Sequence, residues 1–173
     1  MIEHPLLFTG EMVGRILDGG MTQTRRVHVG RYRNWKVGDT IWVREAFGIN
    51  RKTGNLYYRA DNPEGTHSGL VYKWNPSIHM FRKYARIFLE ITGLRDERVQ
   101  DIDAVEAEAE GVRRPKRLCP DRHDEYILER FQRLWDSINA KRHNGIYAWP
   151  KNPVVKVIEF KKEVTCKNQN RTA

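Results

Sequence analysis

The segment Ile16–Val27, with the sequence ILDGGMTQTRRV, is predicted to contain the end of a helix and the β-structure that follows it. Upstream of it, Thr9 favours a helix N-cap, and the apolar residues that follow recur at helical spacing. Those apolar positions are Met12, Val13, Ile16 and Leu17. Gly19-Gly20 ends the predicted helix, because glycine accepts the left-handed conformation that a helix end needs. Thr22–Val27 is then predicted to be β-structure.

The rest of the chain supplies mostly strands, followed by two helices. One helix starts at Asp103, which forms a capping-box pattern with Glu106, and ends at Gly111. The next carries an apolar face of Ile127, Leu128, Phe131, Leu134, Trp135 and Ile138. The predicted strands are Leu6–Phe8, Thr40–Phe47, Leu56–Ala60, Arg86–Leu94 and Val154–Phe160. Successive strands without intervening helices favour an α+β fold, with an antiparallel sheet or small barrel and helices outside it.

Composition limits the class of protein. The chain has 173 residues, of which 39% are hydrophobic, and a net charge of +9, values that fit one folded domain over residues 1–163 and a flexible polar tail over 164–173. No apolar run approaches the roughly 20 residues that span a bilayer, and the first residues lack a secretory pattern. Two cysteines cannot form a disulfide framework. We therefore expect a cytoplasmic protein with no membrane partner.

Positive charge gathers with aromatic residues in the segment Arg25–Lys36, and a second basic cluster spans Arg113–Arg117. Arginine and lysine neutralise phosphates and aromatic rings stack on bases, so the first cluster suits nucleic acid or nucleotides. The alternative is a solvated basic surface that only keeps the protein soluble. The acidic segment 101–110 contrasts with both clusters, since it holds five acids and no base.

Known catalytic and cofactor motifs are absent from the sequence, including the phosphate-binding loop and the dinucleotide fingerprint, and the histidines lack metal-ligand spacing. We expect no metal and no cofactor. The turn after Gly20 combines backbone donors with Thr22, Thr24 and two arginines, which suits an anionic or amide-bearing ligand. In the acidic helix, Glu110 stands out because an acid in the last turn opposes the helix dipole.

The chain resembles the ASCH domains of the PUA-like superfamily, in particular those common in bacteriophages and prophages. The ILDGGMTQTRRV segment carries the resemblance first. The further matching segments, in order, are Gly38-Asp39, Trp42–Glu45, Pro76–Met80, Ala109–Gly111, Leu134–Asn139, Asn152-Pro153 and Val157–Phe160. The resemblance implies a small β-barrel with flanking helices, and a cleft that receives RNA, a nucleoside or a modified base.

One branch of that family, the N4-acetylcytidine amidohydrolases, implies catalytic residues. The family's threonine corresponds to Thr24 and its glutamate to Glu110, while its lysine position is occupied by Met21. A thioether can neither accept a proton nor stabilise an oxyanion. Whether the protein is an enzyme is therefore open, with hydrolysis of an acylated cytidine as the alternative to binding.

As a binding module, the protein would hold its ligand with residues of the opening turn and of the Thr40–Phe47 segment. The candidate ligand-binding residues are Thr22, Arg25, Arg26, Trp42 and Arg44. Trp42 and Arg44 share one face of their strand, and Glu45 lies on the other. The alternative for either Arg44 or Glu45 is an internal salt bridge with no role in binding. A third possibility is a phage accessory protein that contacts a host protein through Arg113–Arg117.

Overall fold

The computed structural model describes residues 1–27, 30–66, 68–115 and 122–163. Its centre is a five-stranded sheet with the order β1-β3-β6-β7-β2. The strands are β1 (Glu3–Leu7), β2 (Gln23–Val27), β3 (Thr40–Arg44), β6 (Phe88–Arg98) and β7 (Val154–Lys162). β1 pairs with β3 in parallel and the other pairs are antiparallel, which confirms the predicted α+β class.

β1 and β2 form the two edges of this sheet, and no backbone ladder joins them among the described residues. Instead, Arg26 Nη2 of β2 donates a hydrogen bond of 2.8 Å to the Leu7 carbonyl at the end of β1. A side chain therefore links two edges that a fully closed barrel would join through its backbone.

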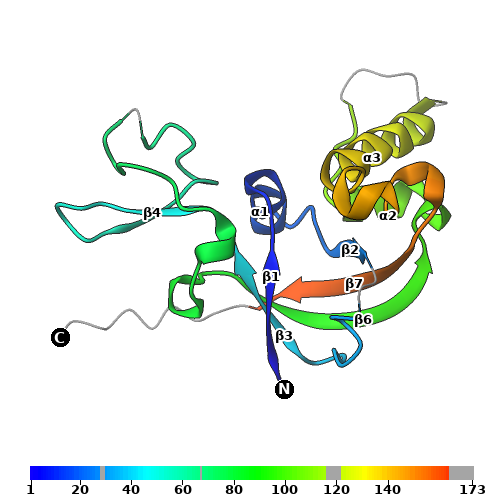
Figure 1. Cartoon of the computed structure of the whole chain (residues 1–173), viewed down its shortest axis with the longest axis horizontal. Coiled ribbons are helices and arrows are strands. Elements are labelled where there is room, and N and C mark those ends of the chain that lie inside the picture. Colours follow the sequence, from blue (N-terminus) through cyan, green and yellow to red (C-terminus); the bar gives the residue numbers. More distant parts are fainter. Residues whose placement is uncertain (28–29, 67, 116–121, 164–173) are drawn as a thin grey trace.

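The predicted strand Thr40–Phe47 divides into two. β3 ends at Arg44, and β4 (Phe47–Ile49) pairs with β5 (Leu56–Tyr58) in a separate two-stranded sheet. Between them Glu45 is buried, and its carboxylate accepts hydrogen bonds from Arg86 Nε at 2.8 Å and Nη2 at 3.0 Å. The internal salt bridge anticipated here is thus made by Glu45. The hairpin projects away from the main sheet (Figure 1).

The first two helices begin where their local signals place them. Thr9 Oγ1 accepts from Met12 N at 3.3 Å before α1 (Gly10–Leu17), and Asp103 forms a capping box with Glu106 before α2 (Ala104–Ala109). The third helix, α3, spans His123–Asn139 and buries the centre of its predicted apolar face. Short 3₁₀ turns cover Ser77–His79, Arg82–Tyr84, Val99–Asp101, Arg142–Gly145 and Trp149–Lys151.

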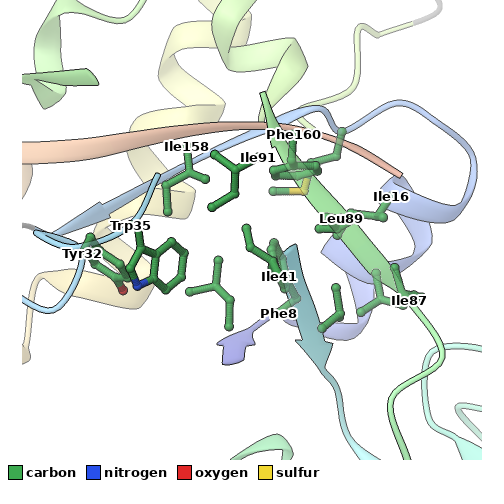
Figure 2. Close-up of a cluster of buried hydrophobic side chains, with 14 residues drawn as sticks. Phe8, Ile16, Tyr32, Trp35, Ile41, Ile87, Leu89, Ile91, Ile158 and Phe160 are labelled. Atoms are coloured by element: carbon green, nitrogen blue, oxygen red, sulfur yellow. The ribbon is translucent and has the colours of Figure 1, made fainter. Parts of the chain in front are cut away.

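The sheet is buried on both faces. Alternate residues of β7 enter different cores: Ile158 and Phe160 belong to a cluster with α1, whereas Val155 and Val157 pack with residues of α2 and α3. Figure 2 shows the first cluster, in which Trp35 and Tyr32 lie beside the isoleucines of the sheet. This arrangement places α1 and α3 on either side of the β2 edge.

No helix in the described part of the chain is long and apolar enough to cross a membrane. Two predictions fall on residues outside the described ranges: the tail 164–173, and the second half of the basic cluster, from Lys116 to Arg117.

Candidate functional site

A cleft of about 190 Å³ opens between the unpaired edges of the sheet. Its walls come from Pro5–Leu7 of β1, Thr24–Val27 of β2, Glu110 after α2, and one side of α3. We call it the seam cleft, because it lies along the line where β1 and β2 fail to pair. Arg26 crosses that line through its bond to Leu7.

Glu110 reaches the seam cleft because the end of α2 is tied to the start of β2. Thr22 N donates to the Ala109 carbonyl at 2.8 Å, and Met21 forms an isolated bridge with Glu110. Gly111 follows with a φ of 95°, a left-handed conformation that turns the chain away. Glu110 is only 5% exposed, and this burial raises the pKa of its carboxyl to about 7.

Arg25 holds the Glu110 carboxylate in place. Its Nη1 donates to Glu110 Oε1 at 3.0 Å, its Nη2 contacts Glu106 Oε2 at 2.7 Å, and its Nε donates to Glu97 at 2.8 Å. The Arg25 side chain has no exposed surface. Its donors are thus directed at three carboxylates, and it acts on the cleft by positioning Glu110.

Arg95 extends this network from the side of the sheet. Its guanidinium contacts Glu97 at 2.9 Å and also pairs with Glu106 and Glu159. Glu97 and Glu106 therefore each bridge two arginines, and the ion pairs form a connected network. Removal of one member would leave like charges close together in a poorly hydrated environment.

Two further arginines line the seam cleft with most of their donors unpaired. Arg26 donates one hydrogen bond, to Leu7 O, and lies 4.9 Å from the centre of the Phe8 ring. Arg44 donates one to Ile78 O and lies 5.5 Å from the Trp42 ring. In each case Nε is buried and has no partner in the described part of the structure. Each guanidinium carries five N–H groups, so the wall has a surplus of donors.

Thr24 lies between these charged groups on β2. It is 1% exposed, lines the seam cleft, and stands in register with Ile158 of β7. The cleft therefore combines a threonine side chain, a carboxyl that titrates near neutrality and two arginines with spare donors, a set that can bind a polar, planar ligand through complementary hydrogen bonds.

No family model matches this chain, and no curated protein matches it. One solved structure is similar: the crystal structure of an ASCH domain from Lactobacillus crispatus JV V101, with 13% sequence identity and a TM-score of 0.43. The alignment covers 93% of this chain and 79% of that one.

The structure brings four of the sequence-predicted residues into contact with one cavity, namely Thr24, Arg26, Arg44 and Glu110. Arg25 reaches the same cavity, but with its donors already paired. Two candidates lie elsewhere. Thr22 is exposed and lines a different hollow beside Gly19 and Gly20. Trp42 is half-buried between Pro5 and Phe88 and does not line the seam cleft.

Met21, which the resemblance to the amidohydrolases aligns with a catalytic lysine, packs in the first hydrophobic core. It is 2% exposed and does not line the seam cleft. The amidohydrolase alternative therefore lacks a basic group at this position, and Glu110 lies opposite Met21 across the isolated bridge.

Sequence reasoning missed several residues of the cleft. Arg142, in the 3₁₀ turn after α3, lines it, and so do Leu134 and Ile138, which the helical pattern assigns to a core face. Arg31 belongs to the basic and aromatic cluster but was not singled out there. No local signal separates Arg142 from any other exposed arginine. The described residues contain no group of three His, Cys, Asp or Glu side chains that could hold a metal.

Proposed function

We propose that this protein is an ASCH-type, PUA-like module that binds a nucleobase, free as a nucleoside or within RNA, in the seam cleft. The single observation that carries the proposal is the surplus of arginine donors at Arg26 and Arg44, whose buried Nε atoms have no acceptor among the described residues and which line the cleft together with Thr24. A buried N–H without an acceptor costs about 1–3 kcal/mol, so a ligand with carbonyl or ring-nitrogen acceptors would remove a penalty that the free protein carries.

Glu110 supports recognition of a base in particular. With a pKa of about 7, its carboxyl can donate or accept a hydrogen bond near neutral pH, so it can match the donor and acceptor pattern of a base edge. The opening motif and the Ala109–Gly111 segment, which carry the resemblance to ASCH domains, supply Thr24 and Glu110 to the same cavity. A phage or prophage origin remains a prediction from that resemblance.

Isothermal titration with the four common ribonucleosides and N4-acetylcytidine tests the proposal. We expect saturable binding of at least one of them that persists at raised salt, because a base contact depends little on ionic strength whereas a phosphate contact depends strongly on it. Arg26→Met should remove the binding, and the matched control Arg51→Met, on the projecting hairpin, should retain it. Absence of saturable binding for every nucleoside would overturn the proposal.

A second candidate is an amidohydrolase that removes an acyl group from an N4-acetylcytidine-like nucleoside. The presence of Thr24 and Glu110 in one cavity favours it, since a carboxylate that titrates near pH 7 is a suitable general base. In that mechanism Thr24 Oγ1 would attack the acyl carbonyl, Glu110 would accept the proton, and the donors of Arg26 would stabilise the oxyanion.

Chromatographic turnover of N4-acetylcytidine separates the two candidates. Turnover that Thr24→Ala and Glu110→Gln each abolish, in variants whose circular dichroism spectra match that of the wild type, would establish the hydrolase. Binding without turnover would leave the protein as a recognition module. Contact with a host protein through Arg113–Arg117 gains no support: Arg114 pairs with Glu108, Arg113 lies 3.7 Å from Asp18, and Lys116 and Arg117 lie outside the described ranges.

A further inference from the structure

The seam cleft opens into a second cavity on each side. One, the helix-side hollow, has a volume of about 460 Å³ between α1 and α3 and shares Met12, Glu110 and Leu134 with the cleft. The other, the hairpin-side hollow, has a volume of about 750 Å³ and reaches past Arg59 and Pro76 toward the β4–β5 hairpin.

The hairpin-side hollow also shares walls with the seam cleft. The shared residues are Leu7, Met12, Arg26, Ile138 and Arg142. Figure 1 shows α1 between the hairpin on one side and α2 with α3 on the other. Thr9, Glu11 and Met12 at the start of α1 line both hollows, and each hollow shares further lining residues with the seam cleft. We call these three adjoining cavities the groove.

Exposed arginines line each of the three cavities of this groove. They are Arg59 in the hairpin-side hollow, Arg31 and Arg142 at the seam cleft, and Arg130 in the helix-side hollow. None of the four has an ion-pair partner in the described part of the chain, and Arg130 contacts only the Tyr126 ring and its hydroxyl, at 3.2 Å. The acids on the same path are fewer: Glu11 lies on α1, Glu129 lies on α3 and already pairs with Arg133, and Glu110 is shared by the seam cleft and the helix-side hollow.

We propose that the groove binds an internal segment of a single-stranded polynucleotide, with one base in the seam cleft and the neighbouring nucleotides in the two hollows. This inference rests on the proposed function, and it names the form of the ligand: a continuous strand whose phosphates contact the four arginines. A free nucleoside would occupy only the centre of the groove and leave both hollows and their charges unused.

The size of the seam cleft favours a single strand over a duplex. At about 190 Å³ it is smaller than the 300–1,000 Å³ typical of pockets for drug-sized ligands, so it suits one base and not a base pair. A base that enters it must leave its stack, and the cost of unstacking is least in a strand that is already unpaired. The Tyr126 ring in the helix-side hollow offers a face on which a neighbouring base can stack.

Fluorescence anisotropy with a short labelled single-stranded RNA, recorded over a range of salt concentrations, tests this path. Each phosphate contact in a single strand contributes about 0.7 to the slope of log affinity against log salt. Arg59→Ala and Arg130→Ala should each lower the slope by about that amount. Lys52→Ala and Lys151→Ala, which remove the same charge from exposed sites outside the groove, should leave it unchanged. The nucleoside affinity found by titration should be the same in all four variants.

Two results would overturn the inference while the proposed function stands: equal slopes for groove and control variants, or a free nucleoside that binds as tightly as the strand. Tighter binding of a duplex of the same sequence would overturn it as well. If the wild-type protein binds neither strand nor nucleoside, both the inference and the proposed function fail. Melting temperatures of the variants, which change only exposed side chains, confirm that each variant is folded.

Discussion

Arg25 Nη1 donates to Glu110 Oε1 at 3.0 Å, so the carboxylate that lines the seam cleft is held by an arginine whose own side chain is fully buried. The neighbouring Arg26 has the opposite character, because its one hydrogen bond goes to a backbone carbonyl and its remaining donors are unpaired. These two adjacent residues of β2 therefore have different roles: Arg25 stabilises the acidic network, and Arg26 is available to a ligand.

Substitution of these two arginines should separate stability from binding. Arg25→Met leaves Glu97, Glu106 and Glu110 without their shared cation, and we expect a loss of about 3–5 kcal/mol in the free energy of unfolding. Arg26→Met removes one hydrogen bond and should cost about 1.5 kcal/mol or less while it abolishes nucleoside binding. Urea denaturation and calorimetric titration measure the two effects. Equal losses of unfolding free energy in Arg25→Met and Arg26→Met would contradict these different roles.

Glu110 should make stability depend on pH between about 4.5 and 7. Its pKa is raised in the folded state, so over this window the folded protein binds more protons than the unfolded chain, and stability falls as pH rises. The free energy of unfolding of Glu110→Gln, taken relative to wild type, should increase by about 3 kcal/mol as pH rises across this window. Unfolding by urea at several pH values measures the difference.

The control for this experiment is Glu108→Gln, two residues earlier on α2, where the carboxylate is partly exposed and pairs with Arg114. Its stability relative to wild type should vary little over the same range. A pH dependence that Glu110→Gln leaves unchanged would show that other groups produce it.

Met21→Lys should destabilise the fold, because residue 21 packs in a hydrophobic core and a buried ammonium loses its hydration. We expect a loss of about 4 kcal/mol at neutral pH, which diminishes at alkaline pH as the amine loses its charge. Met21→Leu, a change that nearly conserves volume, should cost less than about 1.5 kcal/mol. A lysine variant as stable as the leucine variant would mean that its amine reaches Glu110, and this would favour the hydrolase.

Asp39 should stabilise the first residues of the chain except in strong acid. Its carboxylate accepts from Ile2 N at 2.9 Å and Lys36 N at 3.1 Å and contacts His4 Nε2 at 3.0 Å. The hydrogen bond with His4, together with those from the backbone, lowers the pKa of Asp39 to about 2. Its stabilising effect is therefore complete above the ordinary pKa of about 3.9 and is lost as pH falls through 2.

The comparison of Asp39→Asn with wild type checks this prediction. The difference in melting temperature between Asp39→Asn and wild type should be constant from about pH 4 to neutrality, and it should approach zero as pH falls to about 2. Glu11→Gln, which changes an exposed carboxylate on α1, provides the control. A difference that persists undiminished at the lowest pH would show that the Asp39 contacts do not depend on its charge.

Much of the fold could be predicted because the signals are local. The Thr9 and Asp103 caps lie three residues from the amides they bind, and the apolar face of α3 is visible in its own periodicity. The end of β3 could not be predicted in this way. The strand pattern continues in the sequence through Glu45 to Phe47. In the structure, Glu45 is buried in an ion pair with Arg86, which lies 41 residues away in the chain.

The candidate site shows the same limit. The sequence by itself determined which chemical groups are available: a threonine and two arginines on one strand, and an acid at the end of a short helix. Only the tertiary structure decided that Arg25 is paired, that Arg26 is not, and that Arg142 joins the cleft while Trp42 and Thr22 do not. The physical reason is distance along the chain, because the carboxylates of Glu97, Glu106 and Glu110 lie 72, 81 and 85 residues from Arg25. Only the pairing of β6 and β2 with the two sides of β7, together with the packing of α2 against β2, brings them to it.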